Sequence, residues 1–231
     1  MLHGHMDIEI RDFNTADEYF EGGGAAEWAE LEGVLQNLEP HLQASDQAGI
    51  TGTPIFDPKG TNAALNAAAK ALGWITVPVP RSLTMFGKDW DAGKGSTLAE
   101  WQFSNYPFLW NNVIRTQAVV TGQVALQGVG TTGALVVVAK SGAFPASQST
   151  LYFEQARAQL DAVFRLGAFS LPVRLIGLMI PTGVTRLPLV WSTYSGRNSR
   201  TPLTRENVEA LVTWGTRPSR YGTLKATFRV R

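Results

Sequence analysis

The spacing of apolar residues predicts helices and strands that alternate along most of the chain. After Ala25, apolar residues recur at steps of three and four, which predicts an amphipathic helix that ends before Pro40. The same spacing predicts helices over residues 61–72, 108–123 and 151–166.

Three helix starts carry capping signals. Thr15 and Glu18 have the spacing of a capping box before a short helix. Thr61 is the expected cap of the alanine-rich helix. Ser104 or Asn105 is the expected cap of the helix over residues 108–123.

Strands are predicted where apolar residues alternate or run together between turn-forming residues. They cover residues 7–13, 75–79, 98–103, 134–139, 171–180, 187–194 and 224–230. Residues 44–61 are rich in Gly, Pro, Ser, Thr and Asp, and are predicted to form a long loop. The sequence therefore predicts an α/β fold with a mixed sheet, helices on both of its faces and a β-rich C-terminal appendage.

The composition excludes several classes of site. The chain has 231 residues and no cysteine, so we expect one domain over residues 1–231 without disulfide, thiolate or cysteine–zinc chemistry. The histidines, His3, His5 and His41, have no metal-ligand spacing. No apolar run approaches the length of a membrane span and the N-terminus lacks a signal pattern, so we expect no membrane partner and a cytoplasmic location.

The formal net charge of +1 hides a strong asymmetry. The first sixty residues contain twelve acidic and two basic residues, whereas residues 181–231 contain nine basic and two acidic residues. A basic C-terminal segment is typical of a surface that binds phosphates. The alternative is a solvated face, or a patch neutralised by the acidic N-terminal helices.

The candidate site lies in residues 88–112, where two carboxylates and an amide flank a Gly-rich turn. Glu100 and Gln102 are two residues apart in a predicted strand and therefore point to the same face. Asp91 precedes the turn and can reach them across a hairpin. Asp89, Asp91 and Glu100 are also three of only five acidic residues between positions 61 and 180.

A carboxylate inside an apolar strand needs a partner, because an ionised group is costly to desolvate. Glu100 lies in the apolar run 98–103. Either a metal ion compensates Glu100, or a nearby cation such as Lys94 does so in a purely structural role. Hard oxygen ligands beside a neutral amide suit Mg²⁺ with several retained waters.

This set of residues fits the hydrolysis of a phosphodiester, which needs a positioned water, a cation and protonation of the leaving oxygen. Asp91 would bind Mg²⁺ directly, with the Trp101 carbonyl as a second protein ligand. Glu100 would hold metal-bound water. Gln102 would orient the attacking water without acting as a base.

Several longer motifs accompany this site in a fixed order. They are Asp91, Glu100 and Gln102 at their spacing, the run Phe-Ser-Asn-Tyr-Pro-Phe-Leu-Trp-Asn-Asn at 103–112, and residues 44–48, 55–62, 144–147, 152–156 and 199–201. Together they closely resemble the BglII family of type II restriction endonucleases. The resemblance covers most of the chain to about Arg205 and fades beyond it.

The resemblance implies a homodimer that encircles duplex DNA. Each subunit would have the restriction-endonuclease (PD-(D/E)XK-like) α/β core and a β-sandwich-like subdomain, with β-rich DNA-embracing elements within about residues 181–231. Such an enzyme uses Mg²⁺ and cuts both strands at a palindromic hexanucleotide with a GATC-like centre. It works beside a cognate DNA methyltransferase.

The resemblance also implies roles for individual residues. Asp91, Glu100 and Gln102 match the catalytic positions. The expected DNA contacts are Lys94, Ser104, Asn105, Gln148, Ser149, Asn198, Ser199 and Arg200. The family pattern has Asn at the position of Gln148 and Tyr at that of Asn198, which leaves the recognised sequence open. The alternative for Gln148 is a helix cap without a base contact.

Two other functions are compatible with these residues. A non-catalytic DNA-binding protein with the same fold would bind without turnover, although the complete set of Asp91, Glu100 and Gln102 argues against it. A sugar or nucleotide hydrolase would use Asp91 and Glu100 as general acid and base. That reaction leaves the basic C-terminal segment unexplained.

Overall fold

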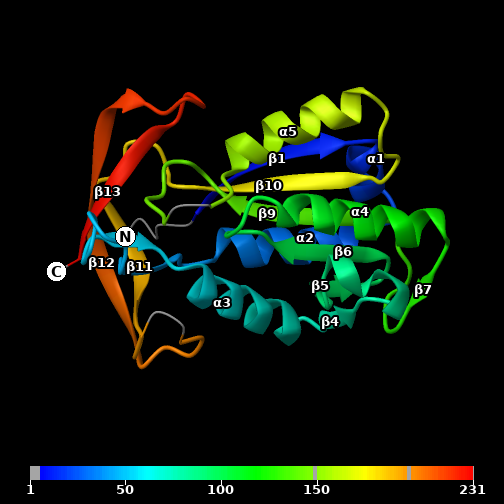
Figure 1. Cartoon of the computed structure of the whole chain (residues 1–231), viewed down its shortest axis with the longest axis horizontal. Coiled ribbons are helices and arrows are strands. Elements are labelled where there is room, and N and C mark those ends of the chain that lie inside the picture. Colours follow the sequence, from blue (N-terminus) through cyan, green and yellow to red (C-terminus); the bar gives the residue numbers. More distant parts are fainter. Residues whose placement is uncertain (1–5, 148–149, 197–198, 231) are drawn as a thin grey trace.

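Two large β-sheets build the protein, for which a computed structural model describes residues 6–147, 150–196 and 199–230. The larger sheet has six strands in the order β1-β10-β9-β6-β5-β4 (Figure 1). Strands β10, β9 and β6 at its centre run parallel, and the other three pair antiparallel. Their bounds are Asp7–Phe13 (β1), Val173–Met179 (β10), Ala134–Lys140 (β9), Thr97–Trp101 (β6), Asp89–Lys94 (β5) and Ile75–Pro78 (β4).

Helices cover both faces of this sheet, because its central strands are apolar on both sides. In β9, Val136 and Val138 pack into one core, and Leu135 and Val137 pack into the other. The core of Val136 is covered by α1 (Ala16–Glu21), α2 (Ala25–Gln36) and α3 (Pro58–Ala71). The core of Leu135 is covered by α4 (Phe108–Thr121) and α5 (Phe153–Arg165). The predicted mixed α/β sheet with helices on both faces is confirmed.

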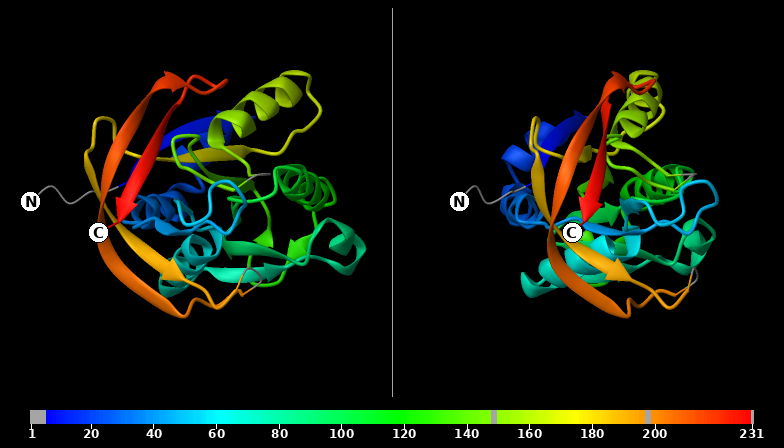
Figure 2. Two further views of the ribbon diagram at one scale, coloured as in Figure 1. Left: turned by 60° about the vertical axis from the view of Figure 1, so that its left-hand side comes forward. Right: turned by 90° about the vertical axis from the view of Figure 1, so that its left-hand side faces the viewer.

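The second sheet has five strands in the order β13-β12-β11-β2-β3 and lies across one end of the molecule (Figure 2). It contains the predicted β-rich C-terminal part, but residues 44–61 are not one long loop, because β3, which pairs with β2, and the first turn of the following helix lie within this range. Leu42 and Phe56 from these short strands are buried. The bounds are Leu224–Val230 (β13), Thr204–Pro218 (β12), Arg186–Thr193 (β11), His41–Ala44 (β2) and Pro54–Phe56 (β3).

Smaller elements complete the chain. A short hairpin joins β7 (Ala125–Leu126) to β8 (Gly130–Thr131), and a 3₁₀ helix, η1 (Arg81–Phe86), precedes β5. Within the described ranges, every helix is too short or too polar to cross a membrane.

The cap of α3 differs from the prediction. Asp57 occupies the cap position, and its Oδ1 accepts a hydrogen bond from the Lys59 N–H at 3.1 Å. Thr61 lies inside the helix instead. Its Oγ1 accepts a hydrogen bond from the His41 N–H at 3.3 Å, which ties α3 to β2.

Of the other two predicted caps, one is at the predicted position and one is wrong. Thr15 occupies the cap position of α1, but it has a φ of 57° and makes no side-chain capping hydrogen bond. Pro107 occupies the cap position of α4, in place of Ser104 or Asn105. The carbonyls of Ser104 and Asn105 bind the Gln102 amide instead.

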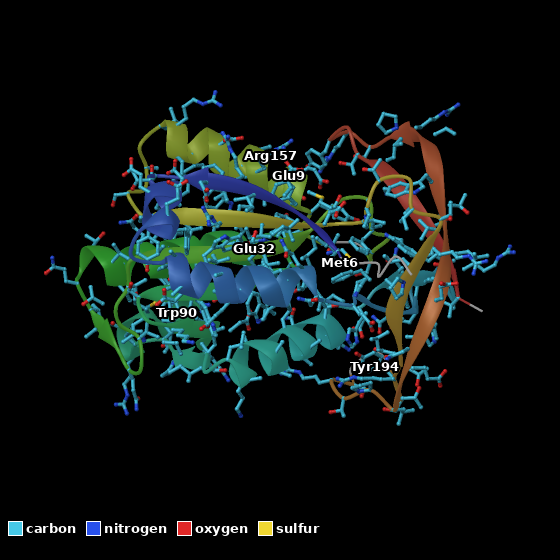
Figure 3. All side chains as sticks on the ribbon, turned by 180° about the vertical axis from the view of Figure 1, so that it is seen from behind. Met6, Glu9, Glu32, Trp90, Arg157 and Tyr194 are labelled. Carbon is cyan, nitrogen blue, oxygen red and sulfur yellow. The ribbon has the colours of Figure 1, made fainter. Side chains whose placement is uncertain are left out.

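A buried polar cluster lies at the start of α3, beside the five-stranded sheet. Tyr194, labelled in Figure 3, donates a hydrogen bond to Asp57 Oδ2 at 2.7 Å, and His41 Nδ1 lies 3.3 Å from Ser192 Oγ. Gly60 is required here, because a Cβ would lie 2.5 Å from both Asp57 Oδ2 and His41 Nδ1. Burial is the main cause that lowers the pKa of His41.

We expect His41 to make the protein less stable as the pH falls below about 6.5. The unfolded chain binds a proton at His41 in this range, whereas the buried side chain in the folded protein binds it only at lower pH. Since the unfolded state then holds more protons, the free energy of unfolding decreases as the pH falls. Urea unfolding of His41→Gln should show a shallower slope, by at most about 1.4 kcal/mol per pH unit. A slope equal to that of the wild type would contradict the expectation.

Candidate active site

The hairpin of β5 and β6 places the candidate catalytic side chains. Trp101 and Phe103 pack into the core that α2 and α3 cover. Because side chains alternate along a strand, Glu100 and Gln102 point to the opposite face, toward α4.

A β-bulge in β5 brings Asp91 to the same place. Over two residues of β4, the pairing advances from Gly93 to Trp90, so β5 carries one extra residue in this interval. Trp90 packs into the core beside α4, at the position labelled in Figure 3. Asp91 lies next to the end of β6, where its Oδ2 accepts a hydrogen bond from the Trp101 N–H at 2.8 Å.

These residues line one cavity of about 430 Å³, which also receives side chains from η1 and α4. Asp91, Glu100 and Gln102 contribute to its wall together with Trp101 and Ser104. The hairpin therefore brings the three predicted catalytic residues together. Their catalytic roles remain predictions.

Arg115 of α4 is the partner of Glu100. Its Nη2 donates hydrogen bonds to Glu100 Oε1 and, at 2.9 Å, to the Asp89 carbonyl. The guanidinium carbon lies 4.8 Å from the centroid of the Trp90 ring. Both charged side chains are almost fully buried, with 3% of Arg115 and 7% of Glu100 exposed, so the pair is shielded from solvent.

Glu100 and Asp91, which both line the cavity, have raised pKa values. Burial is the main cause that raises the pKa of Glu100 well above its ordinary value, and the Asp91 charge adds to it while Arg115 opposes it. Burial also raises the pKa of Asp91, against the hydrogen bond from the Trp101 N–H. These two carboxyl groups therefore gain stability as anions from any cation that enters the cavity.

The Gln102 amide is held at both ends. Its Nε2 donates to the carbonyls of Ser104 at 3.3 Å and Asn105 at 3.1 Å, and its Oε1 accepts from Asn112 Nδ2 at 3.1 Å. These contacts fix the direction of Oε1, which keeps capacity for a second hydrogen bond.

Lys94 points to the other side of the hairpin. Its ammonium lies 2.7 Å from Glu30 Oε1 and also donates to the Leu72 carbonyl at 2.7 Å. The structural alternative in which Lys94 compensates Glu100 is therefore wrong, since Arg115 has that role. Lys94 is not part of the cavity wall, and its expected DNA contact has no support from this geometry.

The remaining predicted DNA contacts form two groups, which are residues that the structure describes and residues outside that part of the chain. Ser104 and Asn105 are exposed. Arg200 is exposed as well, and the Ser199 carbonyl accepts a hydrogen bond from Lys59 Nζ at 2.5 Å. Three others lie outside the described residues: Gln148, Ser149 and Asn198.

The sequence analysis missed Arg115 and Asn112. Both lie on the buried face of α4, where the helical period places apolar side chains such as Val119. A charged or amide side chain on the apolar face of a helix is the signal that could have identified them. The sequence pattern does not show their partners, Glu100 and Gln102, because these belong to another part of the chain.

The cavity fits a hydrated divalent cation. The charged residues that line it are Lys88, Asp89, Asp91, Glu100 and Arg115, which leaves one formal negative charge in excess. In the part of the chain that the structure describes, no three His, Asp or Glu side chains gather as metal ligands. Mg²⁺ typically takes only one or two carboxylates and keeps several waters, so two carboxylates are sufficient.

Comparison with known proteins gives consistent matches. The sequence profile described as "Restriction endonuclease BglII/BglIII" matches residues 8–178. The type II restriction enzyme BglII of Bacillus subtilis is 38% identical over 225 residues, which is 95% of this chain and 99% of the relative.

Two crystal structures also match over 98% of this chain and 100% of theirs. BglII complexed with a DNA 16-mer has a TM-score of 0.88 at 35% identity, and free BglII has a TM-score of 0.72 at 31% identity. The backbone is therefore more similar to the DNA complex than to the free enzyme.

The mixed sheet, its carboxylate-bearing hairpin and the β-rich subdomain define the protein as a type II restriction endonuclease. Within this class, the chain belongs to the BglII family. The resemblance inferred from the sequence motifs is confirmed.

We expect Arg115→Met to lower the free energy of unfolding by about 3 kcal/mol, because it leaves the Glu100 carboxyl buried without its partner. Urea unfolding measures this decrease. Adding Glu100→Gln to Arg115→Met should recover part of it, since no unpaired charge remains.

Arg157→Met is the matched control for this measurement. Arg157 pairs with Glu9 at 2.7 Å on the surface, where both residues are labelled in Figure 3. Removal of this exposed pair should cost less than about 1 kcal/mol. Equal decreases in the two variants would contradict a special role for the buried pair.

Proposed function

We propose that the protein hydrolyses both strands of duplex DNA at a palindromic hexanucleotide with a GATC-like centre. Mg²⁺ would bind in the cavity of Asp91, Glu100 and Gln102. The meeting of these three side chains in one cavity of a BglII-family chain carries the proposal. Bound Mg²⁺ supplies a water of lowered pKa and offsets the charge that develops on the phosphate.

The protein groups have separate tasks in this proposal. Asp91 and the Trp101 carbonyl would hold the ion directly, and Glu100 would hold a water beside it. Gln102 Oε1 accepts a hydrogen bond from the attacking water and directs it at the phosphorus. Since an amide does not take up a proton at neutral pH, the proton passes to solvent or to a phosphate oxygen.

Arg115 supports the reaction by positioning Glu100. The guanidinium favours the ionised carboxylate in a place where burial and Asp91 disfavour it. Its second hydrogen bond, to the Asp89 carbonyl, joins Glu100 to β5. Both carboxylates therefore keep their places on the hairpin.

The proposed partners follow from the proposed cleavage site. A palindrome has two-fold symmetry, so we propose a homodimer with one cavity for each strand. Similarity to the BglII complex with a DNA 16-mer supports duplex DNA as the ligand. A cognate DNA methyltransferase and a cytoplasmic location are part of the same proposal, because an unprotected site in the cell's own DNA would be cut.

We propose that a basic surface beside Ser147 and Thr150 binds DNA phosphates. In the sequence these two residues flank the expected DNA contacts Gln148 and Ser149. Arg220 from the turn between β12 and β13 and Lys225 from the start of β13 line a cavity of about 720 Å³ with Ser147 and Thr150. No acidic residue lines this cavity among the described residues. Neither Arg220 nor Lys225 forms an ion pair within the described part of the chain, so these charges are available for phosphates.

Hydrogen bonds fix the segment that carries Arg220 and Lys225 to the rest of the protein. Thr223 Oγ1 donates to Glu154 Oε1 at 3.0 Å, and Ser141 Oγ donates to the same oxygen at 2.7 Å. The Ala226 N–H donates to the Ala143 carbonyl at 2.9 Å. Figure 1 shows the turn next to the start of α5. A fixed basic turn loses little conformational entropy when it binds DNA.

We expect a digest of long, fully sequenced, unmethylated DNA with Mg²⁺ to give discrete fragments that end at one palindrome. Asp91→Asn should lower the cleavage rate by about 10³-fold or more, because it removes a direct ligand, while specific binding in Ca²⁺ is kept. Asp161→Asn, which removes only the exposed pair with Arg11, is the control. Folded wild-type protein that cuts with neither Mg²⁺ nor Mn²⁺ would favour the non-catalytic DNA-binding function.

We expect the double variant Arg220→Ala with Lys225→Ala to weaken binding to all DNA sequences alike. The slope of log K against log salt concentration should become shallower by about 0.9 for each phosphate that the variant no longer neutralises. Arg165→Ala, an exposed arginine at the far end of α5, is the control. An unchanged slope in the double variant would assign Arg220 and Lys225 to ordinary solvated surface.

A further inference from the structure

Lys140, the last residue of β9, is an ionisable side chain that the proposed mechanism does not use. It is 0% exposed, on the same face of the strand as Val136 and Val138. Within the described residues it has no carboxylate partner. The aromatic rings of Phe56 and Tyr152 pack against the Lys140 ammonium, and each ring centroid is 5.2 Å from Nζ.

Three acceptors satisfy the ammonium of Lys140. Nζ donates to the Phe103 carbonyl at 2.6 Å, to the Leu151 carbonyl at 3.2 Å and to Thr150 Oγ1. Thr150 Oγ1 in turn donates to the Phe103 carbonyl at 2.9 Å. Burial lowers the pKa of Lys140 to about 7, whereas the two carbonyl acceptors favour the charged form.

These contacts join two functional segments of the chain. Phe103 directly follows Gln102, and Thr150 directly follows Ser149, an expected DNA contact. A further hydrogen bond, from the Leu151 N–H to the Ser104 carbonyl at 3.2 Å, connects the same segments. A displacement of Thr150 and Leu151 therefore acts on the backbone beside Gln102.

Stability alone does not explain a lysine here. Burial of a cation costs solvation free energy that burial of an apolar side chain of similar volume does not cost. The surrounding core is apolar, with Val138 and Phe144 fully buried, and the polar groups that Nζ contacts belong to Phe103, Thr150 and Leu151. We therefore look for the role of Lys140 in the two segments that its hydrogen bonds connect.

We propose that Lys140 is a positioning residue that couples the placement of Thr150 and Leu151, which follow the expected DNA contact Ser149 in the chain, to the placement of the attacking water by Gln102. On the correct sequence, Thr150 and Leu151 stay within hydrogen-bond distance of the ammonium, and Phe103 stays in place. On a wrong sequence, a displacement of Thr150 and Leu151 moves Phe103 and with it the Gln102 amide. The inference rests on the proposed DNA cleavage.

The test is single-turnover cleavage by Lys140→Met on the cognate site and on sites with one base pair changed. We expect the cognate rate to fall by about 10–100-fold, since a displacement near 1 Å at the reacting water has an effect of that size. The rate on changed sites should fall less, so discrimination in the cleavage step decreases. Cognate affinity in Ca²⁺ should change by less than about threefold, because phosphate contacts dominate binding.

Two further variants keep the test independent of folding. Thr150→Val removes only one acceptor and should give a smaller decrease of the same kind. The chain has no cysteine, so Lys140→Cys introduces a single thiol, and alkylation of the unfolded chain with 2-bromoethylamine followed by refolding restores an ammonium at nearly the original length. This treatment should restore both the cognate rate and the discrimination.

Val136→Ala is the control for a loss of packing, because Val136 lies on the same face of the same strand. It should lower the unfolding temperature and leave discrimination unchanged. Lys140→Met that cuts cognate and changed sites at rates within about threefold of the wild type, or alkylation that restores nothing, would overturn the role of Lys140. Wild-type protein that cuts no DNA would instead overturn the proposed function.

Discussion

The candidate catalytic cavity depends on the buried ion pair between Glu100 and Arg115. Burial raises the pKa of both Asp91 and Glu100, and the charge of Asp91 raises that of Glu100 further, so a fixed cation beside them favours the ionised forms. Gly87 makes room for this cation. Its φ is 140°, and a Cβ at this position would overlap with Arg115 Nη1. Gly87 and Arg115 together therefore allow Asp91 and Glu100 to lie in the same cavity.

Helix α4 supports most of the site from one face. Asn112 binds the Gln102 amide, Arg115 binds Glu100, and Thr116 Oγ1 accepts a hydrogen bond from Trp90 Nε1 at 2.9 Å. These three residues recur at the spacing of adjacent helical turns. Helix α4 thus covers the apolar sheet and also orients the hairpin that carries the candidate catalytic residues.

Much of the fold is predictable from local patterns. Apolar runs such as residues 134–139 and 171–180 predicted the central strands, because a strand buried on both faces has to be apolar throughout. The short strands β2 and β3 were missed, since strands of three or four residues carry no period, and their Gly- and Pro-rich connection is typical of loops. The cap at Asp57 was missed for a similar reason, because several nearby residues suit a helix start.

The sequence by itself determined which residues share the hairpin face, since alternation along a strand places Glu100 and Gln102 together and the turn returns the chain to Asp91. Only the tertiary structure decided which cations accompany them. Arg115 rather than Lys94 reaches Glu100, because helix packing brings α4 across the hairpin while Lys94 faces α2 on the other side. Partners of buried charges depend on long-range packing, which local sequence patterns do not encode.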